Sequence, residues 1–149
     1  MNKSNKKTIL TEELMHLIEN SKNIDEVLQN HEEDINNIDL QTYLYKLIDK
    51  AALTIPQMIE KASISKSLAY QIFNGQRTPN RNLIIRMALI MKLSLEETQR
   101  LLKIAKKGEL YPRIQRDAAI VFCIQHKYSF IEANEMLDDL GEALLLKED

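Results

Sequence analysis

Residues 53–80 read LTIPQMIEKASISKSLAYQIFNGQRTPN, and this stretch carries the strongest local structural signals in the chain. Thr54 and Gln57 have the Thr-x-x-Gln spacing of a capping box, in which each side chain satisfies a backbone N–H of the other residue. Pro56 falls in the first turn, where its missing N–H costs little. The pattern predicts a short helix over about 55–62.

A second helix is expected directly after the connector Ser63-Ile64-Ser65. Ser65 is placed to cap this helix, and Gly75 is placed to end it in the left-handed conformation that glycine adopts most easily. We therefore expect the second helix to span about 66–73. Two short helices joined by a turn of three or four residues are typical of the helix-turn-helix, whose second helix fits the major groove of DNA.

The sequence on either side of this stretch predicts three more helices. Upstream, apolar residues at helical spacing predict a helix over about 40–52 with one core-facing stripe, formed by Leu40, Leu44, Leu47, Ile48 and Ala51. Downstream, Pro79-Asn80 begins a helix that ends near residue 91. A second capping box, Ser94-x-x-Glu97, opens a helix that runs through Lys107.

Strand signals are absent, because the chain has no sustained alternation of apolar and polar residues and few Gly or Pro turns. The sequence therefore predicts an all-α fold. We expect three parts: a helix-turn-helix domain over 39–108, an acidic helical N-terminal segment over 1–38 and an acidic helical C-terminal segment over 109–149.

In the N-terminal segment, Thr11 can cap a helix that reaches about Asn20. Its apolar residues have the spacing of one buried stripe, formed by Leu14, Leu17 and Ile18. A short second helix is expected around 24–28, and the polar stretch NHEEDINNID at 30–39 is expected to form a loop or linker.

In the C-terminal segment, Pro112 suits the first position of a helix that reaches about His126, with a stripe formed by Ile114, Ala118, Val121 and Phe122. A third capping box, Ser129-x-x-Glu132, opens a last helix that Gly141 ends. The apolar side of this helix can pack inside the chain or against a second copy through Met136, Leu137, Leu140 and Leu144.

The net charge of −2 conceals an uneven distribution. The balance of Lys and Arg over Asp and Glu is −4 for 1–38, +7 for 39–108 and −5 for 109–149. A basic middle between acidic ends suggests that the middle meets a polyanion, while a solvated charged surface is the alternative interpretation.

From Leu53 to Glu97 the chain resembles, without gaps, the phage-repressor-type (Xre-type, Cro/C1-type) helix-turn-helix family. The pattern around the second helix is matched by Ser63, Ile64, Ser65, Ile72, Gly75 and Pro79. The later part of the pattern is matched by Leu83, Ala88, Leu93, Ser94, Leu95 and Glu97. One position departs from it, because Ile55 stands where many members have a Gln.

The resemblance implies a five-helix domain that reads double-stranded DNA with the helix over 66–73. The positions from which such repressors touch base edges are Lys66, Ser67, Tyr70 and Gln71. Phosphate contacts are implied in the loop that follows, at Asn74, Gln76, Arg77 and Asn80. Arg81 and Arg86 are expected to pair with carboxylates of the protein instead.

Enzymatic signals are nearly absent. Three separated glycines cannot build a Walker loop or a GxGxxG turn, and the single Cys123, within an apolar helix, is expected to be a buried inert thiol. The three histidines have no metal-ligand spacing. We expect no catalysis, no cofactor and no metal. With no membrane-spanning run and no signal sequence, a cytoplasmic location is expected.

The sequence thus predicts a DNA-binding transcription regulator of the repressor type, acting as a homodimer on a two-fold operator. The alternative is a helix-turn-helix fold used as a protein-interaction or antitoxin-like module, with a protein partner bound through the acidic ends.

Overall fold

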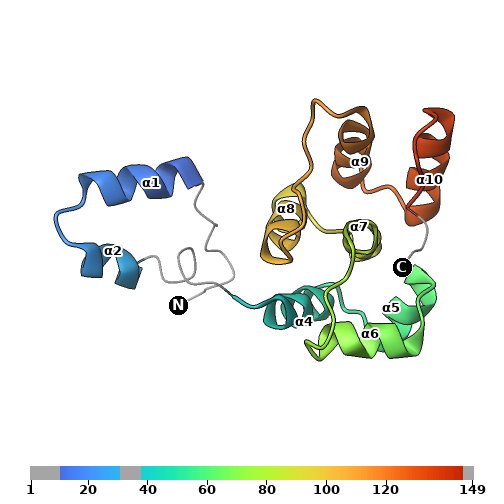
Figure 1. The fold of residues 1–149 in the computed structure, drawn as a ribbon, viewed down its shortest axis with the longest axis horizontal. Helices are drawn as coiled ribbons and strands as arrows, with labels where there is room; N and C mark the ends of the chain where they lie inside the picture. Colours follow the sequence, from blue (N-terminus) through green and yellow to red (C-terminus); the bar gives the residue numbers. More distant parts are fainter. Residues whose placement is uncertain (1–10, 31–37, 146–149) are drawn as a thin grey trace. The chain divides into compact units, whose positions relative to one another are not determined.

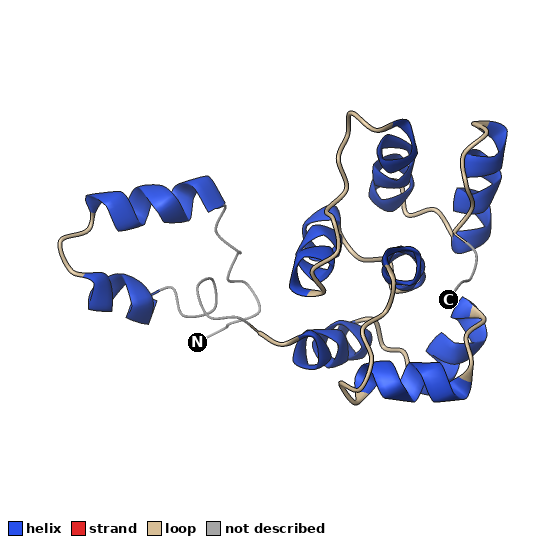
Figure 2. Cartoon of the chain, viewed as in Figure 1, coloured by secondary structure: helices blue, strands red, loops and turns tan. Residues whose placement is uncertain are grey.

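The structure is a computed structural model that describes residues 11–30 and 38–145. All regular elements within these ranges are helices, as Figure 2 shows, so the predicted all-α class is confirmed for the described residues. The chain divides after Ile38 into two compact units, which are described one at a time. Most of the predicted linker, residues 31–37, lies outside the described residues.

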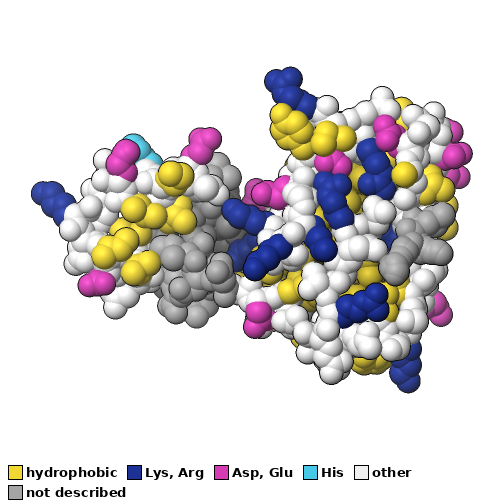
Figure 3. All heavy atoms as spheres, viewed as in Figure 1, with side chains coloured by type: hydrophobic (Ala, Val, Ile, Leu, Met, Phe, Trp, Pro, Cys, Tyr) yellow, Lys and Arg dark blue, Asp and Glu magenta, His cyan; other side chains and the backbone are white. Residues whose placement is uncertain are grey.

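The N-terminal unit contains helices α1 (Thr11–Asn20) and α2 (Ile24–Asn30), which pack against each other. The predicted buried stripe on α1 is wrong, because no residue of α1 is buried and Leu17 and Ile18 are exposed. Val27 of α2 is buried. Two helices this short have too little apolar surface between them to enclose a core. Their hydrophobic side chains instead gather on the face of this unit seen in Figure 3.

The larger unit has helices α4 (Leu40–Lys50), α5 (Ile55–Ala62), α6 (Lys66–Phe73), α7 (Arg81–Ile90), α8 (Leu95–Ile104), α9 (Gln115–Gln125) and α10 (Phe130–Asp139). In Figure 1, α7 lies in the middle of this unit, and it packs against α5, α8, α9 and α10. Every residue from Leu83 to Leu89 is buried. A helix that is covered on all sides forms the centre of the core.

The helix starts predicted from capping residues in this unit are confirmed. Capping boxes are formed by three pairs: Thr54 with Gln57, Ser94 with Glu97, and Ser129 with Glu132. Ser65 and Asn80 cap α6 and α7 by accepting hydrogen bonds from the backbone N–H groups of Leu68 and Leu83. In these five helices, the polar residue just before the helix therefore sets where it begins.

The helix ends share one feature, which is a residue in the left-handed conformation just after the helix. From α4 to α10 these residues are Ala52, Ser63, Gly75, Lys92, Lys106, Lys127 and Gly141, with φ between +55° and +82°. The predicted stops at the two glycines are confirmed. Helix α8 ends at Ile104 rather than Lys107, because Lys106 has already left the helical conformation.

Two of these left-handed residues, Lys92 and Lys127, form reciprocal hydrogen bonds. The Nζ of Lys92 donates to the backbone carbonyl of Lys127 at 2.9 Å, and the Nζ of Lys127 donates to the carbonyl of Lys92 at 3.0 Å. These ammonium groups lie at the C-terminal ends of α7 and α9, where the helix dipole favours positive charge.

The prediction for the start of α9 is wrong, because the helix begins at Gln115 and Pro112 lies in the turn before it. The carboxylate of Asp117 accepts from the backbone N–H of Tyr111 at 2.9 Å and holds this turn against the helix. The predicted apolar stripe does not face the core, since Ile114 and Phe122 are exposed. Helix α9 buries another side, formed by Asp117, Ala119, Ile120, Cys123 and Ile124.

Three arginines form ion pairs or hydrogen bonds that connect the C-terminal segment to α7. Arg81 pairs with Asp117, Arg116 donates to the Oδ1 of Asn82 at 3.0 Å, and Arg86 donates to the carbonyl of Leu145 at 3.3 Å. Leu137 of α10 is fully buried, so this member of the last helix's apolar side belongs to the core, whereas Leu140 is exposed. Residues 109–145 therefore belong to the same compact unit as α4 to α8.

Candidate nucleic-acid interface

Helix α6 is held in the larger unit by one side of its surface. Ala69, Ile72 and Phe73 are buried, and α6 packs against α4 and α5. The ring of Phe73 meets the ring of Tyr45 from α4 edge to face, with 5.3 Å between their centres. Met58 of α5 is fully buried as well.

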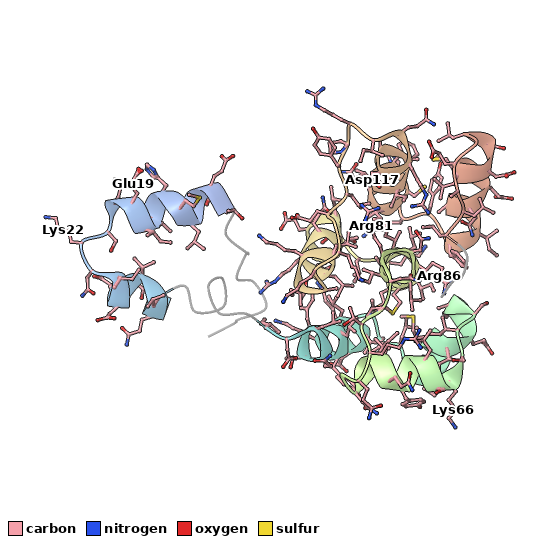
Figure 4. The ribbon with its side chains drawn as sticks, viewed as in Figure 1. Glu19, Lys22, Lys66, Arg81, Arg86 and Asp117 are labelled. Atoms are coloured by element: carbon pink, nitrogen blue, oxygen red, sulfur yellow. The ribbon has the colours of Figure 1, made fainter. Side chains whose placement is uncertain are left out.

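The four predicted base-reading residues lie on the other side of α6. Lys66 and Ser67 are exposed, and Tyr70 and Gln71 are half-buried. Their positions along the helix, together with Asn74, put them on one face, because residues three or four apart are neighbours on a helix surface. In Figure 4 the side chain of Lys66 projects away from the rest of the unit.

The loop after α6 folds back onto the end of that helix. The carbonyl of Gln71 accepts from the backbone N–H groups of Gln76 at 2.8 Å and Arg77 at 3.2 Å. Gly75 has a φ of +82°, and a Cβ there would come within 3.0 Å of the Gln41 side chain. The close packing and the positive φ explain why glycine stands at this turn.

The predicted phosphate-contacting residues do not share one environment. Asn74, Gln76 and Arg77 are exposed next to the polar face of α6. Asn80 is half-buried, and its Oδ1 accepts from the backbone N–H of Leu83 at 2.8 Å to cap α7. The structure thus brings the first three together with the base-reading residues and gives Asn80 a role in starting the next helix.

The charges of residues 53–80 favour an anionic ligand. This stretch contains one acidic residue, Glu60, against Lys61, Lys66 and Arg77. Some basic residues elsewhere in the unit are engaged within the protein. Lys50 lies 2.6 Å from the carboxylate of Glu97.

The expected carboxylate pairing is confirmed for Arg81. Its guanidinium binds both carboxylate oxygens of Asp117, at 3.1 and 2.9 Å. Arg86 is buried under the ring of Phe130, with 5.7 Å from its Cζ to the ring centre, and donates to a backbone carbonyl rather than to a carboxylate in the bonds described. Both arginines therefore hold the fold together.

Gln41 is a residue of this region that the sequence did not single out. It is half-buried near the start of α4, and its side chain lies against Gly75. The signal that points to it is indirect, since a glycine at a helix end implies that another group comes close. Gln41 therefore supports the loop that carries Arg77.

We also searched the described residues for a metal site, a reactive cysteine and a membrane-spanning helix. No group of three or more His, Cys, Asp or Glu residues there could hold a metal ion. Burial raises the pKa of the Cys123 thiol, with Glu132 as a lesser cause, so this cysteine stays protonated. None of the described helices is both long and apolar enough to cross a bilayer.

Comparison of the chain with protein-family models, with curated proteins and with solved structures returned no match.

Proposed function

We propose that this protein is a sequence-specific DNA-binding transcription regulator of the repressor type, with α4 to α8 forming a five-helix helix-turn-helix domain. The observation that carries the proposal is the polar outer face of α6, which continues into an exposed loop bearing Arg77. A capped eight-residue helix of this kind is small enough to enter the major groove.

The side chains of this face have the chemistry for reading bases. Gln71 can bond adenine at two positions, Lys66 can donate to the acceptors of guanine, and the ring of Tyr70 can pack against the methyl group of thymine. Ser67 can donate or accept, so it can contact either kind of base edge. These contacts would supply sequence preference.

The loop would supply affinity and register. Arg77 is the main candidate for a phosphate contact, and Asn74 and Gln76 can donate hydrogen bonds to neighbouring phosphate oxygens. The Oδ1 of Asn80 already accepts the capping hydrogen bond from Leu83, and this bond limits what Asn80 can contribute to phosphate binding. Contacts of this kind carry no sequence information. They weaken as the salt concentration rises, because the release of counterions from the DNA then gains less entropy.

The proposal is tested by selecting bound duplexes from a random-sequence pool with the full chain. We expect enrichment of a site with two-fold symmetry, since a homodimer would engage two half-sites about one helical turn apart. Lys66→Ala should relax the preference at one base pair of each half-site. Lys103→Ala, which removes an exposed lysine from α8, is the matched control and should leave the preference unchanged.

The second candidate function is a protein-interaction or antitoxin-like module. It is favoured by the N-terminal unit, where Met15 and Ile24 are 66% and 54% exposed among acidic side chains. A chain that ignores random duplexes at low salt but retains a protein partner in a pull-down would support this candidate over DNA binding.

A further inference from the structure

Helix α4 borders the C-terminal end of α6 and the loop that follows it. The side chain of Gln41 lies against Gly75, and the ring of Tyr45 meets the ring of Phe73, the last residue of α6. Gln41 and Tyr45 are four residues apart, so they share one side of α4. Helices α4 and α6 are in contact and lie next to each other in Figure 1. This side of α4 is therefore an edge of the candidate nucleic-acid interface.

The contact with Phe73 places Tyr45 beside the polar face of α6. Phe73 is buried, while Tyr70, three residues earlier and hence its neighbour on the helix surface, belongs to the predicted base-reading set. Phe73 thus stands at the boundary between the buried side and the polar face. Tyr45 packs on this boundary and is itself 45% exposed, so solvent reaches it next to the polar face.

Both side chains have hydrogen-bond donors that the fold leaves available. Within the described residues, neither the hydroxyl of Tyr45 nor the amide of Gln41 forms a hydrogen bond. Gln41 is half-buried, but its amide is not enclosed by the protein. Gln and Tyr side chains are among the groups that donate to phosphate oxygens in protein–DNA complexes.

Helix α4 and its cap bring no net charge to this edge. Lys46 and Lys50 are balanced by Asp39 and Asp49, and Lys50 already lies 2.6 Å from the carboxylate of Glu97. A contact between α4 and a phosphate would therefore depend on neutral donors. Such a contact neutralises no phosphate charge, so it leaves the salt dependence of binding unchanged.

We propose that Gln41 and Tyr45 form a second phosphate contact of the DNA interface, adjacent to that of the loop. The inference rests on the proposed function, because it requires α6 in the major groove. The loop after α6 then meets the phosphate backbone at one border of the groove, and Gln41 touches that loop. Gln41 and Tyr45 are about 6 Å apart along α4, so they can donate to the same strand as the loop.

The decisive variant is Tyr45→Phe, which keeps the ring against Phe73 and removes only the hydroxyl. With the full chain, the affinity for the selected duplex and for a random-sequence duplex should each fall about tenfold, as for one hydrogen bond to a charged group. The slope of log affinity against log salt should stay unchanged. Tyr111→Phe, at an exposed tyrosine before α9, is the matched control and should have no effect.

Variants of Gln41 separate a direct contact from support of the loop. If Gln41 only supported the loop, Gln41→Ala would displace Arg77 and lower the salt slope by about one. A direct contact predicts a lower affinity with an unchanged slope. Gln41→Glu puts a carboxylate where the amide would meet the phosphate, so it should bind more weakly than Gln41→Ala. Gln125→Glu, at the exposed end of α9, is the control for the added charge.

Four results would overturn the proposal. These are full affinity in Tyr45→Phe, a loss in Tyr45→Phe that is confined to the selected duplex, a salt slope lowered by about one in Gln41→Ala, and Gln41→Glu binding as well as Gln41→Ala. Circular dichroism and thermal melting check that each variant is folded. An unchanged chain that binds neither duplex would reject the proposed function and this inference with it. Sequence-specific binding that none of these variants weakens would reject this inference alone.

Discussion

Arg81 and Asp117 lie 36 residues apart in the sequence and form a two-pronged ion pair, with Nη1 donating to Oδ1 and Nη2 to Oδ2. The aspartate side chain is only 5% exposed. Arg81 also donates to the backbone carbonyls of Gly108 and Glu109. Since Arg81 is the first residue of α7, directly after the cap Asn80, the pair anchors the helix that follows the candidate DNA-binding loop.

Asp117→Asn should destabilise the fold, because it leaves Arg81 without a charged partner. We expect a loss of about 2 kcal/mol in the free energy of unfolding, less than for a fully buried pair because Arg81 remains partly in solvent. Urea unfolding followed by circular dichroism measures this. Asp138→Asn, at an exposed position of α10, is the control and should change stability by less than about 0.5 kcal/mol.

The same pair should make stability depend on pH. Burial alone would raise the pKa of Asp117, but Arg81 and the backbone N–H of Tyr111 outweigh it and hold the pKa below its ordinary value of 3.8. A carboxylate whose pKa is lowered in the folded state contributes its full stabilisation of the fold above its unfolded-state pKa. This contribution is lost as the pH falls through the folded-state pKa. Below about pH 4 the unchanged chain should therefore lose stability faster than Asp117→Asn. Parallel curves would contradict this.

Adjacent residues of α6 should separate DNA reading from folding. Gln71→Ala should cost about 1–3 kcal/mol of binding free energy on the preferred duplex and leave the melting temperature nearly unchanged. Ile72→Ala should lose about 2–5 kcal/mol of fold stability, because Ile72 is 1% exposed in the core. Binding by fluorescence anisotropy and melting by calorimetry test the two effects. Gln125→Ala, at the exposed end of α9, should affect neither.

Arg77→Ala should weaken specific and non-specific DNA binding alike. Loss of one phosphate contact lowers the slope of log affinity against log salt by about one. Titrations at several salt concentrations measure this slope. Arg113→Ala removes another exposed arginine, outside the candidate interface, and should leave the slope as it is. An unchanged slope in Arg77→Ala would remove Arg77 from the site.

The left-handed residue after α4 offers a test of the helix ends. Ala52 is exposed with a φ of +58°, a conformation that costs alanine about 1 kcal/mol relative to glycine. Ala52→Gly should therefore raise the free energy of unfolding by up to about 1 kcal/mol. Its neighbour Ala51 has a φ of −77°, so Ala51→Gly should destabilise instead. Thermal and urea unfolding of the two variants should shift in opposite directions.

The sequence predicts most helix starts well because most are specified by a polar residue with a fixed geometric role. Helix α9, which follows Ile114 and has no side-chain cap, is the exception. Ser65 and Ser94 are visible as caps from their spacing alone. The ends are less visible, because left-handed conformations at Lys106 and Lys127 leave no mark of the kind that Gly75 leaves. Local chemistry thus predicts where these helices begin better than where they end.

The side that a helix buries is predictable only when one side is apolar. In α9 the residues from 118 to 124 are apolar all round, so periodicity gives no preference, and the Arg81 contact to Asp117 fixes the rotation of the helix. In α1 one side is apolar, but no described partner covers Ile18. The polar face of α6 was predictable because Ile72 and its buried neighbours define the opposite side, whereas the support from Gln41 depends on tertiary contact.

The position of α7 has a consequence for synthesis. A ribosome releases a chain from its N-terminus, so α7 emerges before α9 and α10, which cover part of it. Until Leu145 has left the exit tunnel, Arg86 lacks the carbonyl to which it donates in the finished protein. A nascent chain paused after residue 108 would therefore hold the whole predicted DNA-reading region while part of its central helix still faced water.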